Sequence, residues 1–132
     1  LDSRRDAAVT TTLHAVHLAR QFAATRAVSI ELCGSLDTVH CSGMVDWSSG
    51  LLILGADGTV HRSLPSFRST HGPTLRSNRA VIRFEPGTSY ASPATMTICD
   101  RRGGGAARAV IVSRSGRPRV SARDASNRVL QC

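Results

Sequence analysis

The chain has no lysine, and all 17 of its basic residues are arginine. A GC-rich genome produces this bias without a functional cause, so the choice of arginine does not by itself mark a binding site. No apolar run approaches the ~18 consecutive residues that a transmembrane helix needs, and no signal peptide opens the chain. The first residues, LDSRRDAAVTTTL, have a helical pattern and no initiator methionine. We therefore expect a mature or trimmed fragment whose N-terminal part has been removed.

Several catalytic and metal-binding motifs are also missing. No serine lies in a nucleophile elbow, and the segment RRGGGA (101–106) lacks the Lys-Ser/Thr ending of a phosphate-binding loop. The absence of a CxxC pair argues against zinc and thioredoxin-like sites. His14 and His17 stand three residues apart, but the pattern supplies no third metal ligand. We therefore predict a protein that is not an enzyme and has no cofactor or metal.

Aromatic residues are few: the chain has one Trp, one Tyr and three Phe. None of them lies after Tyr90. Proteins that bind single-stranded nucleic acid stack bases on aromatic side chains. The sequence therefore argues against a stacking platform near the C-terminal quarter of the chain.

The chain contains four cysteines, and their even number favours disulfides in an oxidising compartment. Buried free thiols are the alternative. Cys33 and Cys41 stand at the two ends of a predicted loop, and Cys99 could then hold the C-terminus through Cys132. Three pairings are possible for four cysteines, and we expect this one. The longer of the two loops would contribute roughly 3–4 kcal/mol to stability.

Residues 3–26 have the apolar period of an α-helix, with Ser3 as the predicted N-cap and Asp6 completing a weak capping box. One apolar stripe comprises Val9, Leu13, Val16 and Ala23. A second face carries Leu18 and Phe22, which we interpret as a contact with a neighbouring subunit. The alternative is that a sheet of the same chain and its loops cover both faces.

The period changes to that of strands after residue 26. Strands are predicted at 27–33, on both sides of an Asp57-Gly58 turn within 49–62, and at 79–85, 94–100, 107–114 and 117–122. The polar segment 63–78 contains Pro65, Gly72 and Pro73, so we expect a long surface loop. The prediction is one α+β domain, 1–132, with an N-terminal helix packed on antiparallel sheets of about six or seven short strands.

Positive charge is concentrated in the last quarter of the chain. Residues 101–132 hold eight arginines and one acid, a net charge of +7, whereas residues 1–100 hold nine arginines and eight acids. Such an asymmetry suits a polyanion or an anionic surface.

The last two predicted strands carry much of this charge. They flank Ser115-Gly116 as a hairpin turn, and Pro118 marks the second strand as an edge because proline cannot donate to a ladder. Arg117 and Arg119 are two residues apart, so in a strand they point to the same side, about 7 Å from each other. The planar fork of arginine binds phosphate in a bidentate manner.

The order of elements resembles that of type IV pilins and pseudopilins, and three stretches resemble the GspH/FimT-type minor pilins. These are ARQFAATRAVSIELC (19–33), DWSSGLLILGADG (46–58) and the end from Ile98 to Arg119. Leu51 departs from the family pattern, in which an aromatic residue is usual. The resemblance implies a pilin-like domain in which 1–26 is the C-terminal half of the pilin helix and 27–132 is the β-rich head. The hydrophobic half of that helix would precede Leu1.

Within this family, FimT-like minor pilins are associated with DNA binding during natural transformation, and a Gly-Arg-x-Arg element carries much of it. Gly116, Arg117, Pro118 and Arg119 match that element residue by residue. The resemblance implies sequence-independent binding to the backbone of double-stranded DNA, with other pilins of the fibre and the inner membrane as further partners. It also implies a pilus and periplasmic location. The predicted DNA-binding residues are Arg101, Arg102, Arg108, Arg114, Gly116, Arg117, Arg119 and Arg123.

Three alternatives remain open for the basic hairpin. It could be a solvated edge that prevents strand-to-strand aggregation, or it could bind lipid headgroups or lipopolysaccharide. The protein could also be a structural or priming minor pilin, like FimU, or a type II secretion pseudopilin, like GspH. In that case the arginines would serve subunit contacts.

Overall fold

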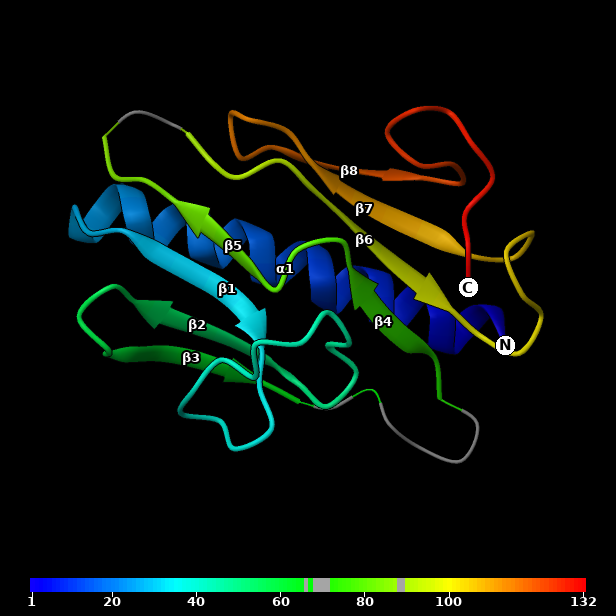
Figure 1. Cartoon of the computed structure of the whole chain (residues 1–132), viewed down its shortest axis with the longest axis horizontal. Helices are drawn as coiled ribbons and strands as arrows, with labels where there is room; N and C mark the ends of the chain where they lie inside the picture. Colours follow the sequence, from blue (N-terminus) through cyan, green and yellow to red (C-terminus); the bar gives the residue numbers. More distant parts are fainter. Residues whose placement is uncertain (66, 68–71, 88–89) are drawn as a thin grey trace.

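A computed structural model of the chain describes residues 1–65, 67, 72–87 and 90–132 (Figure 1). These residues form one helix and eight strands. The elements are α1 (Asp2–Arg26), β1 (Ile30–Gly34), β2 (Leu51–Gly55), β3 (Val60–Leu64), β4 (Thr74–Ser77), β5 (Val81–Phe84), β6 (Ala94–Cys99), β7 (Arg108–Val112) and β8 (Pro118–Ser121).

The strands form two antiparallel sheets of four strands each, and both lie along α1 (Figure 1). The first sheet has the order β3-β2-β1-β5, and the second has the order β4-β6-β7-β8. The predicted fold, a helix packed on antiparallel sheets, is confirmed. The described residues contain eight strands, more than the six or seven expected, because one more strand lies within the predicted loop 63–78.

That additional strand is β4, in which Leu75 and Ser77 are buried and alternate with exposed residues. It forms an edge of the second sheet and pairs with β6, with Leu75 opposite Ile98. The prediction of a continuous loop over 63–78 is therefore wrong at Thr74–Ser77, and also at its first two residues, where β3 continues to Leu64. Residues 66 and 68–71 of that segment lie outside the described part of the chain.

The α1 helix packs closely against both sheets because its buried stripe is made mostly of small residues. The buried residues are Ala8, Val9, Thr12, Ala15, Val16, Ala19 and Ala23. Alanine side chains let a helix approach a sheet closely without loss of packing density. The helix begins at Asp2 after Leu1, with no side-chain cap hydrogen bond, so the predicted Ser3 N-cap is wrong. It ends at Arg26, and the C-cap residue Ala27 has a left-handed backbone.

The second apolar face of α1 packs against other residues of this chain. Leu18 and Phe22 are half-buried and pack against the main core. The Phe22 ring stacks on His61 of β3 with 5.1 Å between ring centroids, and the Arg26 guanidinium lies 5.5 Å from the Phe22 centroid. Contact of these two residues with a neighbouring subunit stays a prediction.

The main hydrophobic core fills the space between α1 and the two sheets, and a smaller cluster lies in the second sheet and the C-terminal tail. The smaller cluster comprises Cys99, Ala107, Ala109, Ile111 and Leu130. The Cys99–Cys132 disulfide fastens the C-terminal tail to β6 of the second sheet. This disulfide was predicted and is confirmed.

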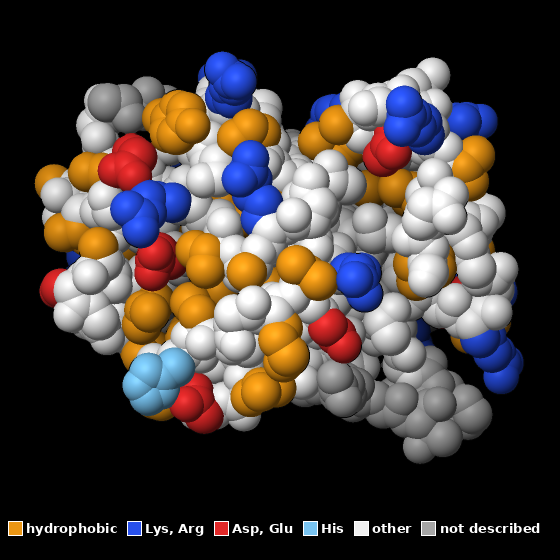
Figure 2. Space-filling model, in the orientation of Figure 1, with side chains coloured by type: hydrophobic (Ala, Val, Ile, Leu, Met, Phe, Trp, Pro, Cys, Tyr) orange, Lys and Arg blue, Asp and Glu red, His pale blue; other side chains and the backbone are white. Residues whose placement is uncertain are grey.

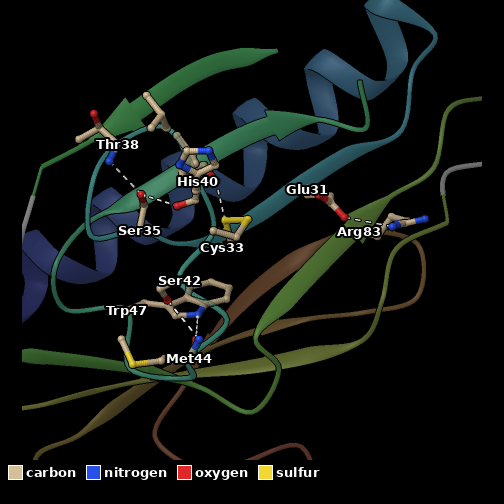
Figure 3. The surroundings of a disulfide bond; sticks show 12 residues. Glu31, Cys33, Ser35, Thr38, His40, Ser42, Met44, Trp47 and Arg83 are labelled. Atoms are coloured by element: carbon tan, nitrogen blue, oxygen red, sulfur yellow. Dashed lines mark hydrogen bonds and ion pairs between the residues drawn. A yellow bond between two sulfur atoms is a disulfide. The ribbon is translucent and has the colours of Figure 1, made fainter. Parts of the chain in front are cut away.

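The second predicted disulfide, Cys33–Cys41, is also confirmed and closes a loop after β1 (Figure 3). Inside the loop, the Ser35 hydroxyl accepts a hydrogen bond from the Thr38 amide at 3.0 Å and donates to the His40 carbonyl at 2.7 Å. The His40 ring lies 2.8 Å from the Asp37 carboxylate, which lowers the pKa of Asp37. These bonds give the loop a defined shape without a strand or helix.

Candidate nucleic-acid interface

The β8 strand forms an edge of the second sheet, as Pro118 predicted, and pairs with β7. Arg119 is opposite Ile111, and Pro118 is opposite Val112. Val112 belongs to the main core beneath the sheet, whereas Ile111 belongs to the smaller cluster. Because neighbouring residues of a strand point to opposite faces, Arg119 lies on the outer face of the sheet with Ile111.

The turn between β7 and β8 has three residues, Arg114 to Gly116. The Ser113 amide donates to the Arg117 carbonyl at 3.1 Å, and the Gly116 amide donates to the Ser113 carbonyl at 2.9 Å. Gly116 has a φ of 80°, so the loop is a turn followed by a left-handed residue, a common three-residue hairpin. The predicted two-residue turn at Ser115-Gly116 is therefore wrong by one residue, and Arg114 lies in the turn itself.

The turn is fastened to the body of the domain at two points. The Ala91 amide donates to the Arg114 carbonyl at 2.7 Å. Gly116 is buried, and a Cβ added to it would lie 3.5 Å from Arg20 Cδ of α1 and 3.6 Å from Ala91 Cβ. The backbone that carries Arg114 and Arg117 is therefore held against the helix and the β5–β6 connection.

The side chains of Arg114, Arg117 and Arg119 are available to a ligand. All three residues are exposed, and within the described part of the chain their guanidinium groups make no hydrogen bond or ion pair. Figure 2 shows basic side chains along the margin of the face where β6, β7 and β8 lie in Figure 1. Guanidinium groups without protein partners keep their full hydrogen-bonding capacity for an anion.

Arg123 continues the basic edge beyond β8. Its guanidinium donates to the Asn127 carbonyl at 3.3 Å, and its backbone bridges to Val129. Asp124 is the one acid after residue 100, and its carboxylate accepts hydrogen bonds from the amides of Ser126 and Arg128 at 2.9 and 2.8 Å. These two hydrogen bonds fix the backbone turn at the start of the C-terminal tail.

Three of the predicted binding residues lie away from the turn. Arg101 and Arg102 lie in the β6–β7 connection, at the opposite end of β7 from Arg114. The five residues of β7 span about 16 Å. Arg108 is opposite Ile98, a core residue on the α1 side, so it lies on the other face from Arg119. One ligand group at the hairpin turn therefore does not reach all eight predicted residues.

Arg102 is also committed to an internal ion-pair network. Its guanidinium lies 2.7 Å from the Asp100 carboxylate and 2.7 Å from Asp2 at the start of α1. The hydrogen bond from Arg102 lowers the pKa of Asp100 to about 2, and the same bond raises the pKa of Arg102. Arg5 adds a hydrogen bond to the Ala106 carbonyl at 3.1 Å. This network joins the first turn of α1 to the glycine-rich connection.

A groove of about 450 Å³ lies beneath the hairpin turn, and the sequence did not predict it. Its walls come from the C-terminal half of α1, the end of β5, Tyr90 and the Ser115-Gly116 backbone. Tyr90 is 48% exposed and follows β5 in the chain. In the sequence it lies more than 20 residues before the hairpin arginines. The hydrogen bond from Ala91 to Arg114 brings these two segments together. An aromatic side chain, Tyr90, therefore lies near the basic hairpin, where the sequence argued against a stacking platform.

The model for the family described as type II transport protein GspH matches residues 8–116. This chain belongs to the GspH family. Two crystal structures of the type IV minor pilin FimU from Pseudomonas aeruginosa strain PAO1 have a similar fold. One has a TM-score of 0.68 at 21% identity and covers 91% of this chain and 89% of FimU, and the other has a TM-score of 0.64 at 19% identity and covers 92% of both. No curated protein sequence matches the chain.

The remaining predicted features of this GspH-family chain concern metals and membranes. His14 and His17 are both exposed on α1, and no group of three or more potential ligand side chains could hold a metal ion within residues 1–65, 67, 72–87 and 90–132. The same described residues contain no helix long and apolar enough to cross a membrane.

Proposed function

We propose that this chain is a minor pilin subunit that binds DNA without sequence preference, through the β7–β8 hairpin, during natural transformation. The observation that carries the proposal is the set of three exposed arginines without protein partners, Arg114, Arg117 and Arg119, on a hairpin that is fastened to α1. Gly116 and the two following arginines also match the Gly-Arg-x-Arg element of FimT-like pilins.

The chemistry of the hairpin favours phosphate over base edges. Arginine forks bind phosphate oxygens in a bidentate manner, and the left-handed Gly116 forms the turn that carries them. Recognition of a base sequence in duplex DNA usually places a helix or a strand ribbon in the major groove. Within the described residues α1 is the one helix, and its buried stripe faces the two sheets. We therefore expect binding directed at the backbone rather than readout of bases by a helix.

The structure suggests an order of importance among the predicted residues. Arg114, Arg117 and Arg119 form the centre, and Arg123 extends it along the same edge. Arg101 and Arg108 could contact a long duplex independently of the turn. Arg102 contributes least, because a phosphate would have to compete with Asp100 and Asp2.

The position of the hairpin also suits a subunit anchored through its N-terminus. Arg20, beside the turn, lies about 28 Å along α1 from Leu1 at the usual helical rise. A hydrophobic segment that preceded Leu1 would therefore hold the opposite end of the domain. We propose that the full-length subunit is anchored in the inner membrane and joins other pilins in a periplasmic and extracellular fibre, with the hairpin away from the anchor.

The proposal is tested by titration of a duplex DNA of mixed sequence across a salt series. We expect Arg117→Gln/Arg119→Gln to weaken binding and to reduce the slope of log K against log salt by about one to two, since each phosphate contact contributes about 0.9. Arg4→Gln/Arg62→Gln is the matched control, because both residues are exposed, basic and remote from the hairpin. If both variants lost the same amount of DNA affinity, the effect would be due to overall charge and not to the hairpin. If the wild type did not bind DNA, the proposal would be refuted.

A second candidate function is a structural or priming minor pilin or a type II secretion pseudopilin. It is favoured by the fold shared with FimU and by the description of the matching family. It predicts no DNA affinity at physiological salt and a loss of fibre assembly or secretion when Leu18 and Phe22 are made polar. Vesicles with anionic headgroups, added as competitor in the DNA titration, test the lipid alternative: they would displace the DNA if the hairpin preferred a membrane.

A further inference from the structure

The groove beneath the hairpin turn is a candidate site that the arginines alone do not explain. It is about 450 Å³ in volume, within the range of about 300–1,000 Å³ that is usual for small-molecule sites. Its lining includes His17 and Arg20 from α1, Phe84 from β5, and Tyr90. Phe84 is buried, and Tyr90 is about half exposed.

We propose that this groove accepts one unpaired nucleotide of the DNA whose backbone lies on the hairpin arginines. The base would stack on the Tyr90 ring, and its phosphate would lie near Arg20 and the Ser115-Gly116 backbone. This inference rests on the proposed function, because it assigns the groove as a continuation of the same DNA site.

The first support is the chemistry of Tyr90. Tyr90 is 48% exposed, and its hydroxyl makes no hydrogen bond to any of the described residues. An aromatic side chain that is neither buried nor bonded, beside a basic strand, is the arrangement that proteins use to stack nucleotide bases. Trp47 and Phe84 are fully or nearly fully buried, so neither of them can serve that role.

The second support is the charge around the groove. Arg20 lies against Gly116, with Nε 3.6 Å from the position of an added Cβ, and its guanidinium has no ion-pair or hydrogen-bond partner in the described part of the chain. Glu85 is the one acid in the lining. Its carboxylate accepts a hydrogen bond from the Ser29 hydroxyl at 2.8 Å and lies 4.0 Å from Arg83 Nε. Arg20 is the one arginine of the lining and has no protein partner among the described residues, and Arg114 and Arg117 flank the lining residues Ser115 and Gly116 in the chain.

The third support is the way the groove is joined to the hairpin. Arg114 accepts the Ala91 hydrogen bond through its carbonyl, and Ala91 directly follows Tyr90. A ligand on the turn is therefore held at a defined position relative to the ring. A base paired within a duplex is stacked between its neighbours and presents no free face, so only an overhang, a frayed end or a single strand could enter.

The test uses two DNA ligands: a blunt duplex, and the same duplex with a single-stranded overhang that carries 2-aminopurine, a fluorescent base analogue quenched by stacking. We expect the wild type to bind the overhang duplex about fivefold or more tightly than the blunt one, the lower end of what one stacked base contributes. We also expect the 2-aminopurine emission to fall on binding.

Three variants locate the effect. Tyr90→Ala should lose both the overhang preference and the quenching of 2-aminopurine, but it should keep its affinity for the blunt duplex. Tyr90→Phe, which keeps the ring, should retain the overhang preference, the quenching and the blunt-duplex affinity. Arg20→Gln should weaken the overhang preference. Arg4→Gln, which removes an exposed arginine from the other end of α1, is the matched control and should behave as the wild type. Retained blunt-duplex binding also shows that each variant is folded.

Failure of this inference is distinguishable from failure of the proposed function. If the wild type binds both DNAs equally and Arg117→Gln/Arg119→Gln weakens both, the groove inference is overturned and the hairpin proposal stands. If Tyr90→Ala keeps the overhang preference, the groove inference is likewise overturned. If the wild type binds neither DNA, both proposals are overturned.

Discussion

Gly116 lies where the hairpin, α1 and the β5–β6 connection meet. Its φ of 80° is in the left-handed region, and it is buried against Arg20 and Ala91. Its amide donates to the Ser113 carbonyl and closes the turn. The conformation of this one residue therefore determines where Arg114 and Arg117 leave the backbone.

Replacement of Gly116 by alanine should be costly mainly through the backbone. The added Cβ would make ordinary contacts at 3.5–3.6 Å, whereas a left-handed conformation costs an L-residue about 1–2 kcal/mol. We expect Gly116→Ala to lower the free energy of unfolding, measured with urea, by about that amount, and to weaken DNA binding. Gly105→Ala is the control, because Gly105 has no positive φ and no atom near its Cβ position. Equal stability of the two variants would contradict this account of the turn.

The residues of the candidate site were only partly predictable. The basic cluster was visible because Arg114, Arg117 and Arg119 lie close together in sequence. The ion pairs of Arg102 could not be predicted from the sequence, because one of its two partners is Asp2, 100 residues away in the chain. Tyr90 was missed for the same reason: its place beside the hairpin depends on a contact between two segments that the sequence does not pair.

At the scale of elements, the two disulfides have different tasks. Cys33–Cys41 closes a short loop that already has internal hydrogen bonds around Ser35. Cys99–Cys132 holds a tail whose Leu130 side chain packs with residues of the second sheet, and the Arg123–Val129 bridge lies within that tail. The second disulfide therefore matters more for keeping the basic edge in one shape.

Removal of the two disulfides should have unequal effects on stability. With sequence separations of 8 and 33 residues, the chain-entropy relation gives about 2.5 and about 3.7 kcal/mol. We expect Cys99→Ala/Cys132→Ala to lower the free energy of unfolding by about 1 kcal/mol more than Cys33→Ala/Cys41→Ala, in urea titrations without reductant. A larger loss from the short-loop variant would show that the loop hydrogen bonds depend on its disulfide.

Most elements were predictable because their patterns are local. The β7–β8 hairpin, with Pro118 at an edge, and the Asp57-Gly58 turn follow from residue types. The β4 strand was missed because Leu75 is the one buried large apolar residue in its four, and Pro73 and Gly72 precede it. The helix start was misplaced because Ser3 has the capping chemistry, but the helix extends one residue beyond it to Asp2.

At the scale of the whole molecule, the alanine stripe of α1 and the distribution of charge explain the arrangement. Small side chains, with Ala15 and Ala19 fully buried, allow two sheets to pack along one helix (Figure 1). The number of sheets was not predictable, because strand order depends on pairings across the chain. The first turn of α1 is joined to the β6–β7 connection, and the hairpin turn is joined to α1 near Arg20. The proposed anchor and the proposed DNA site thus lie at opposite ends of the helix.

The central claim is the location of DNA binding, and an amide-resolved NMR titration of the 14.0 kDa chain with duplex DNA tests it most directly. The account predicts that the largest changes in amide chemical shift on addition of DNA occur at Ser113–Ser121, with smaller changes as far as Arg123. The loop closed by Cys33–Cys41 should remain unchanged as an internal reference. Shifts centred on the β6–β7 connection at Arg101, or no shifts at all, would contradict the account.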